Sequence, residues 1–206
     1  NLDNSKPNYV ALGNFDGVHV GHKKLIRSMV KDARKDEARS IVVSFDTHPD
    51  KIIRPHNSKK LLATSRFKAE LFSELNVDYL VFLPFNSDML HLSSREFVED
   101  VLKEYFNPAA VYVGFNYSFG YQGVGSPELL QEYGRRLGFK VNIAQPVFVD
   151  GKIVSSSYIR TLLQNGNINQ AKRCLGYWPV VEGEVVGGDK VGRLLGYPTA
   201  NIVPKE

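Results

Sequence analysis

The sequence predicts an α/β fold, in which a mostly parallel sheet carries helices on both faces and is followed by the start of a smaller β domain. Short runs rich in Val, Ile, Tyr and Phe alternate with amphipathic stretches of helical period through the first 177 residues. This alternation is typical of βαβ units with parallel strands. After Tyr177 the helical period stops and the chain becomes rich in Val and Gly, which indicates β structure.

Five buried strands are predicted, each from a short apolar run bounded by turn signals. They cover residues 8–12, 39–45, 78–83, 109–114 and 139–144. In sheets of this kind, ligands bind outside the carboxyl ends of the strands, at the point where the strand order reverses. The loop after the first strand is therefore the first place to look for a site.

Helices are predicted from apolar side chains at helical spacing and from capping residues. They cover residues 21–34, 65–75 and 93–106, and a further helix opens at Ser126 and Pro127. In the third helix, Ser93 stands three residues before Glu96, which is the pattern of a capping box. In the fourth, proline in the first turn after a serine marks the helix start.

Two smaller features complete the first domain. Asp150 and Gly151 lie between two β-rich runs, which is a hairpin turn signal, and two short helices follow, separated by Gly166. We expect this domain to span residues 1–177. Only about 28 residues follow, too few to close a barrel or a sandwich, so we expect 178–206 to be an incomplete β domain.

Composition excludes several classes of protein. The chain has 206 residues, of which 43% are hydrophobic and 23% charged, as in an ordinary globular protein. Its longest apolar runs have about five residues, where a membrane-spanning helix needs roughly 20, so we expect no membrane span and no signal segment. The single cysteine, Cys174, excludes a disulfide framework and a multi-cysteine zinc site, and it favours the reducing cytoplasm.

The formal net charge of +4 is spread along the chain. A nucleic-acid surface usually shows a basic stripe, whereas basic doublets such as Lys59-Lys60 and Arg135-Arg136 stand far apart in this chain. We therefore expect no nucleic-acid partner. Small phosphorylated ligands account for the mild positive balance equally well.

The loop after the first strand carries the strongest functional signal. In LGNFDGVHVGHKKL, the residues Gly13, Gly17 and Gly21 surround His19 and His22. Small residues let a phosphate approach the backbone closely, and two histidines three apart share a face as the helix begins. The helix N-terminus adds positive potential. Together these features predict a clamp for the phosphates of a nucleotide.

A surface pair or a structural metal site is the alternative for the two histidines. A metal needs further ligands, and the neighbouring residues offer only Asp16. The whole string, a strand followed by G-x-F-D-G-x-H-x-G-H and a helix, is more specific than the pair alone and favours phosphate binding.

The string GNFDGVHVGH resembles the H-x-G-H signature of the nucleotidyltransferase superfamily. The fuller string resembles the adenylyltransferase module of the bacterial riboflavin kinase/FMN adenylyltransferase (FAD synthetase) family, and four later segments are similar to motifs of that family in the same order. They are SFDTHP (44–49), GFNYSFGYQGVG (114–125), VSSSYIR (154–160) and GDKVGRLLGYPTANI (188–202). The chain departs from the family at Thr47, which replaces a proline, and at Ser157, where the family often has threonine.

The resemblance implies a Rossmann-like nucleotidyltransferase domain followed by the beginning of a β-barrel riboflavin kinase domain. It implies transfer of AMP from ATP to FMN, with FAD and pyrophosphate as products and Mg²⁺ accompanying ATP. Phosphorylation of riboflavin to FMN is expected only with a complete second domain. The alternatives are another H-x-G-H transferase, acting on a nicotinamide, pantetheine or glycerol phosphate, and a flavin- or nucleotide-binding module without catalysis.

The resemblance also implies roles for individual residues. The catalytic groups would be His19, His22 and Arg160. ATP would be bound by Gly13, Asn14, Phe15, Gly21, Ser155 and Ser156, and the flavin by Asp46, His48, Pro49 and Asn116. In the kinase motif, Mg²⁺ and ATP phosphates would be held by Thr199 and Asn201.

Two of these groups have structural alternatives. The serines followed by Arg160 also fit an ordinary serine N-cap with a surface arginine. Aromatic residues in segment 114–125 either wall the flavin or fill the core; they are Phe115, Tyr117 and Phe119.

Overall fold

The computed structural model describes residues 6–47, 49–53, 56, 59–189 and 191–204, and at its centre lies a five-stranded sheet. The strands are β1 (Asn8–Leu12), β2 (Arg39–Phe45), β3 (Tyr79–Leu83), β4 (Pro108–Gly114) and β5 (Lys140–Ala144). Every neighbouring pair in the order β3-β2-β1-β4-β5 is parallel. The five predicted strands are confirmed to within one residue at each end.

The strand order reverses at β1. From β1 the chain adds β2 and β3 on one side, and then returns to add β4 and β5 on the other. In such sheets a ligand lies outside the carboxyl ends of the strands, at this reversal. The fold therefore places the histidine-bearing loop at the expected position of a site.

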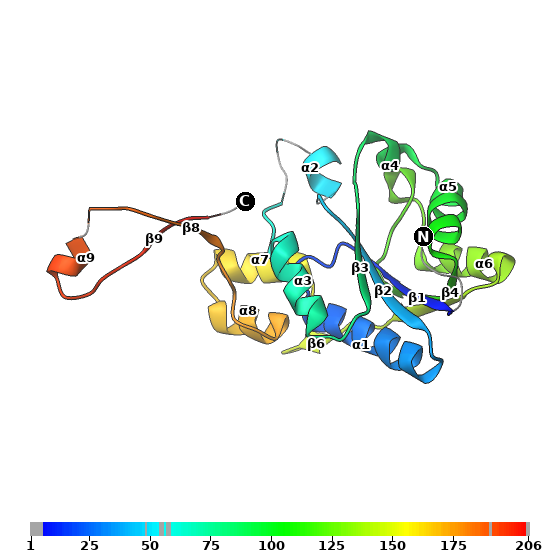
Figure 1. The fold of residues 1–206 in the computed structure, drawn as a ribbon, viewed down its shortest axis with the longest axis horizontal. Coiled ribbons are helices and arrows are strands. Elements are labelled where there is room, and N and C mark those ends of the chain that lie inside the picture. The colour runs from blue at the N-terminus through cyan, green and yellow to red at the C-terminus, as the bar shows by residue number, and fades with distance from the viewer. Residues whose placement is uncertain (1–5, 48, 54–55, 57–58, 190, 205–206) are drawn as a thin grey trace.

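Helices cover both faces of the sheet (Figure 1). Side chains alternate along β1, so that Tyr9 and Ala11 enter the core with α1 and α3, while Val10 and Leu12 enter the core with η2 and α6. The four helices are α1 (Val20–Lys35), α3 (Ser65–Ser73), the π-helical η2 (Phe97–Phe106) and α6 (Pro127–Leu137). The predicted layering is confirmed.

The helix starts follow the predicted caps. Ser93 and Glu96 form a reciprocal capping box in α5 (Ser94–Glu96), which continues directly into η2. The side chain of Ser126 caps α6, with Pro127 in its first turn. The pattern does not predict the short helices, because five residues are too few to show a helical period. These are α2 (Pro49–Ile53) and α4 (Ser87–His91).

A third, smaller core lies beneath two short helices, α7 (Ser156–Gln164) and α8 (Ile168–Leu175). Gly166 separates them with a positive φ of 72°, as its position in the sequence predicts. Cys174 is fully buried in this core, where it packs as a small apolar side chain.

The predicted hairpin precedes these helices. It joins β6 (Phe148–Val149) to β7 (Lys152–Ile153), which pair antiparallel. Asp150 and Gly151 both have positive φ, of 51° and 71°, as the tight turn requires.

The end of the chain forms a second hairpin. β8 (Gly183–Val186) pairs antiparallel with β9 (Asn201–Pro204), and the short helix α9 (Val191–Leu194) lies between them. This hairpin extends away from the sheet and its helices (Figure 1). None of the described residues between 183 and 204 is buried. The predicted β structure is confirmed, whereas the domain boundary after residue 177 stays a prediction.

In the part of the chain that the structure describes, no helix has both the length and the apolar character needed to cross a membrane.

Candidate functional site

The loop after β1 has an unusual backbone. Phe15, Gly17 and Val18 have positive φ, of 47°, 76° and 33°. A β-branched residue rarely adopts such a φ, so the backbone is strained at Val18, whose side chain is fully buried. Backbone strain of this kind collects at functional sites. Here it turns the chain sharply from β1 into α1.

His19 and His22 lie against each other at the start of α1. Nδ1 of His19 accepts a hydrogen bond from the backbone N–H of His22 at 3.3 Å, and so caps the helix. The two rings stack with their centroids 3.5 Å apart. Because Nδ1 of His19 accepts, its neutral ring carries the proton on Nε2, which can donate to a ligand. Nδ1 of His22 is buried and has no hydrogen-bond partner among the described residues.

Both imidazoles are neutral at pH 7. Burial lowers the pKa of His19 from 6.5 to about 4. Burial, with the nearby His19 and Lys68, also lowers the pKa of His22 well below 6.5. The pair therefore meets a ligand through hydrogen bonds rather than as two fixed charges. An anion beside the rings would favour their protonation.

Two glycines of the loop make room for rings. A Cβ on Gly21 would lie 3.2 Å from the ring of His19, and a Cβ on Gly13 would lie 3.0 Å from the ring of Phe15. Phe15 is itself buried, and its ring meets that of His22 edge-on, with centroids 5.2 Å apart. The buried ring of Phe15 therefore packs against the imidazole of His22 and restricts its position.

Asp16 ties this loop to two distant segments of the chain. Its carboxylate forms an ion pair with Arg160 and accepts the backbone N–H of Leu62 at 2.9 Å. Its carbonyl accepts the hydroxyl of Ser156 at 2.9 Å. Arg160 in turn donates to the carbonyl of Lys60 at 2.7 Å. The loop, the segment before α3 and the first turns of α7 are therefore joined at one residue, Asp16, through its carboxylate and its backbone carbonyl.

The structural alternative for the segment at the start of α7, a serine N-cap with a surface arginine, is half right. Ser155 is an N-cap, since its hydroxyl accepts the backbone N–H of Tyr158 at 3.2 Å. Arg160, however, is no surface arginine: its side chain is 12% exposed and is paired with Asp16. Because Ser156 also contacts Asp16, the N-terminus of α7 meets the histidine loop.

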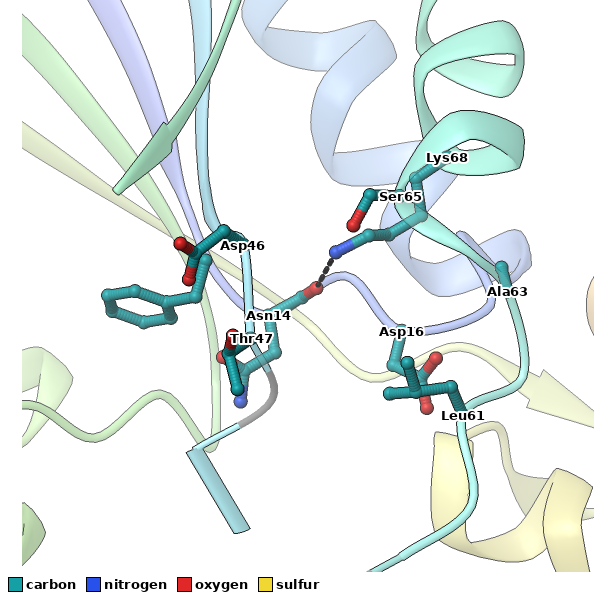
Figure 2. Close-up of a pocket in the computed structure, with 9 residues that line it drawn as sticks. Asn14, Asp16, Asp46, Thr47, Leu61, Ala63, Ser65 and Lys68 are labelled. Carbon is teal, nitrogen blue, oxygen red and sulfur yellow. Dashed lines mark hydrogen bonds between the residues drawn. The ribbon is translucent and has the colours of Figure 1, made fainter. Parts of the chain in front are cut away.

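A small pocket of about 20 Å³ lies between the ends of β1 and β2. Figure 2 shows Lys68 reaching from α3 toward the carbonyl of Asn14, with Asp46 on one side of the pocket and Asp16 on the other. Nζ of Lys68 lies 3.4 Å from that carbonyl oxygen and 3.2 Å from the hydroxyl of Ser44. Asn14 enters these contacts through its backbone, while its residue is exposed.

The residues predicted to bind the flavin are only partly brought together. Asp46 lines the pocket and accepts the backbone N–H of Phe85 at 3.2 Å, and Pro49 begins α2 three residues later. His48 lies outside the described residues. Asn116 is exposed in the turn after β4 and is not among the described residues that line the pocket.

The three aromatic residues after β4 differ in burial. Phe119 is 5% exposed and belongs to the core, and the ring of Tyr117 stacks on it with centroids 5.8 Å apart. Phe115 is 40% exposed. Phe119 and Tyr117 therefore fill the core, and Phe115 is the member of the three that is open to a ligand.

The predicted kinase residues lie on the C-terminal hairpin. Thr199 and Asn201 are both exposed. Thr199 contacts α9, where a Cβ on Gly192 would lie 3.0 Å from its hydroxyl oxygen. Within the described residues, no three His, Cys, Asp or Glu side chains group as a metal site. A Mg²⁺ ion that accompanies ATP would be held mainly by the phosphates of the nucleotide, as is usual for Mg²⁺.

Sequence reasoning assigns no role in the site to Asp16 or Lys68. Asp16 stands inside the histidine string, but its partners are far away in the sequence. Lys68 lies three and four residues before Leu71 and Phe72 and shares their buried face of α3. A lysine on the apolar face of a helix can be recognised in the sequence as a candidate site residue, because lysines are almost never buried without a partner.

A parallel sheet of this order, with an H-x-G-H pair at a helix N-terminus beside the strand reversal, defines a Rossmann-like nucleotidyltransferase fold. The family model for FAD synthetase matches residues 2–158, and the model for riboflavin kinase matches residues 175–206. The chain belongs to the FAD synthetase family.

Individual relatives agree with this assignment. The chain is 34% identical over 194 residues to a bifunctional riboflavin kinase/FMN adenylyltransferase of Buchnera aphidicola subsp. Schizaphis graminum, and 31% identical over 193 residues to that of Escherichia coli K12. Both alignments cover 94% of this chain and 62% of the relative. The chain thus spans less than two thirds of the length of these curated relatives.

One solved structure matches over nearly the whole chain. A protein described as a macrolide-efflux protein from Streptococcus pneumoniae superposes with a TM-score of 0.88 at 31% identity, covering 99% of this chain and 66% of that one.

Proposed function

We propose that this chain transfers the AMP group of ATP to the phosphate of FMN, giving FAD and pyrophosphate. The observation that carries the proposal is the stacked pair of buried His19 and half-buried His22 at the N-terminus of α1, beside the strand reversal of a FAD synthetase family member. The unpartnered Nδ1 of His22 supports a ligand here, because buried polar atoms normally have hydrogen-bond partners.

The reaction needs positioning more than a strong base. A phosphate oxygen of FMN forms a bond to the α-phosphorus of ATP, and the bond from that phosphorus to the bridging β-oxygen breaks. The electron pair leaves with pyrophosphate. The attacking oxygen is already anionic, so catalysis comes from alignment and from stabilising charge on the phosphates.

The two helix N-termini supply the donors for ATP. His19 and His22 donate to its phosphates from the start of α1, and Gly13, Asn14 and Gly21 shape that loop. Ser155 and Ser156 stand at the start of α7. Arg160 stays paired with Asp16 and donates its remaining N–H groups to a phosphate, since a guanidinium carries five donors. Mg²⁺ bound with ATP supplies further positive charge to the leaving pyrophosphate.

The flavin lies on the other side of the same strand ends. Asp46 and Pro49, with His48, follow β2, and Asn116 follows β4. Phe115 is exposed beside Asn116, and its ring suits contact with an isoalloxazine. These assignments rest on the family motifs and on the position of the strand ends.

For the C-terminal region, we propose that the parent protein phosphorylates riboflavin to FMN, in a domain that begins after residue 177. The match of residues 175–206 to the riboflavin kinase family and the names of the relatives support this. Thr199 and Asn201 would hold Mg²⁺ and ATP there. A cytoplasmic location is also proposed, on the single buried cysteine.

Product analysis tests the transferase proposal. The chain is incubated with FMN, ATP and Mg²⁺, and the flavins are separated and identified. We expect FAD from the wild type and from His91→Ala, an exposed histidine on α4, and none above background from the double variant His19→Ala, His22→Ala. Turnover of a nicotinamide, pantetheine or glycerol phosphate substrate in place of FMN would overturn the proposal. So would binding of FMN and ATP without turnover.

A further inference from the structure

Lys68 has an unusual environment for a lysine. The residue is 7% exposed, and it lies on α3 with its ammonium between the ends of β1 and β2. Its hydrogen-bond acceptors are neutral: the hydroxyl of Ser44 at 3.2 Å and the carbonyl of Asn14 at 3.4 Å. The ammonium also lies 5.1 Å above the ring of Phe82.

The nearby carboxylates form no ion pair with this ammonium. Asp16 is paired with Arg160, and Asp46 receives the backbone N–H of Phe85. Among the described residues, no carboxylate lies within ion-pair distance of Lys68. Burial lowers the pKa of its ammonium, and only the more distant Asp16 and Asp46 oppose this. A buried charge without a paired anion is costly, so the position favours an anionic ligand.

A purely structural role accounts poorly for the ammonium. The hydroxyl of Ser44 donates directly to the carbonyl of Asn14 at 3.0 Å. The two strand ends are therefore joined, and that carbonyl has a donor, without Lys68. What the lysine adds is a positive charge that lines the pocket, close to two imidazoles that are neutral.

The position of Lys68 indicates which of the reacting phosphates its ammonium would contact. In the proposed function, ATP is held from the N-termini of α1 and α7. Lys68 approaches from α3, and it shares the pocket with Asp46 and Thr47, which follow β2 on the flavin side. A flavin phosphate carries about −1.5 to −2 charges at pH 7, which must be offset before it can approach a polyphosphate.

Resting on that proposed function, we propose that the ammonium of Lys68 binds the phosphate of the acceptor flavin nucleotide and directs it at the α-phosphate of ATP. Lys68 is then a catalytic residue, in direct contact with the attacking group.

Flavin binding tests the proposal without turnover. FMN and riboflavin differ only by the phosphate, so their dissociation constants are measured by quenching of flavin fluorescence. We expect the wild type to prefer FMN. Lys68→Met should weaken FMN binding by about tenfold or more and leave riboflavin within about twofold, while Lys68→Arg keeps part of the preference. Lys31→Met, an exposed lysine on α1, should match the wild type.

Two binding results would overturn the proposal. One is an equal loss of FMN and riboflavin affinity in Lys68→Met, which indicates a structural role. The other is an unchanged preference for FMN. If Lys68→Met fails to fold by thermal unfolding, Lys68→Gln takes its place, because it keeps a hydrogen-bonding group and removes only the charge.

Steady-state kinetics separate the acceptor from ATP. In Lys68→Met, the KM for FMN should rise about tenfold or more, with the KM for ATP within about twofold of the wild type. A rise in the KM for ATP alone would overturn the assignment to the acceptor. Failure of the proposed function itself is a different result, namely no FAD from the wild type.

Discussion

The α/β body, residues 8–175, and the C-terminal hairpin, residues 183–204, both carry clear sequence motifs. The two regions differ in how deeply the residues of these motifs are buried. In the body, Asp16 and His19 are 4% and 6% exposed, and three buried clusters surround the elements that carry the motifs. In the hairpin, none of the described residues is buried, and Leu194 is 87% exposed.

The difference shows what turns a motif into a site. In the body, buried neighbours hold side chains in one arrangement, as Phe15 does beneath His22 and Arg160 does beside Asp16. Asn201 begins β9 and Thr199 lies just before it, in a hairpin of two strands, and two strands alone are marginally stable in water. Equally recognisable motifs therefore form a packed cluster of side chains in the α/β body and remain exposed in the hairpin.

The largest expected effect is on catalysis, and it should separate the two regions. His22→Ala removes a proposed donor to the phosphates, and we expect the rate of FAD formation to fall about a hundredfold or more. Ile202→Ala, on exposed β9, should leave this rate within about twofold. The rate is measured by chromatographic separation of FAD. Equal losses in the two variants would break the comparison.

The next effect is on stability. Asp16→Ala leaves Arg160 buried without its partner, and breaking such a pair costs about 3–5 kcal/mol. Glu184→Ala, which removes an exposed carboxylate from β8, should cost less than about 0.5 kcal/mol. Urea unfolding monitored by circular dichroism gives both values. A cost below 1 kcal/mol (roughly the range of exposed ion pairs) for Asp16→Ala would contradict the buried arrangement.

Core truncation sharpens the same contrast. Ile26 on α1 is fully buried against the sheet, so Ile26→Ala should lower the free energy of unfolding by about 3 kcal/mol. Leu194→Ala, at an 87% exposed position, should lower it by less than about 0.5 kcal/mol. The same urea titration measures both. A large cost at Leu194 would mean that the hairpin is held by a core.

The smallest effect depends on pH. His19 has a pKa of 6.5 in the unfolded chain and about 4 when folded, so the unfolded chain binds more protons between these values. The contribution of neutral His19 to the free energy of unfolding is therefore present above about pH 6.5 and is lost as the pH drops toward 4. Between about pH 6.5 and 5 this loss amounts to about 1.5 kcal/mol. His22 acts in the same direction.

A capping variant isolates the part of this pH dependence that belongs to His19. His19→Asn keeps a good N-cap but removes the ring that titrates, so its unfolding free energy should fall less steeply with acidification. Urea titrations at several pH values provide the slopes. A variant slope as steep as that of the wild type would show that His19 is not held neutral by burial.

Much of the fold can be predicted from the sequence, because local patterns report it directly. The short apolar run gives β2 as Arg39–Phe45 without error, and the spacing of Ser93 and Glu96 gives a capping box that the structure contains. Short helices escape this reasoning. α4, for example, is set by the cap Asn86 over a single turn, and so short a stretch has no period to detect.

The candidate site divides in the same way. His19 and His22 are three residues apart at a helix start, so the sequence by itself determines that they share a face. Only the tertiary structure decides that the two rings stack and are neutral, and that Asp16 pairs with Arg160, 144 residues further along. It also decides that Lys68 on α3 reaches Asn14 between β1 and β2. Periodicity and caps are local properties, whereas burial and charge pairing depend on which distant segments the folded sheet brings together.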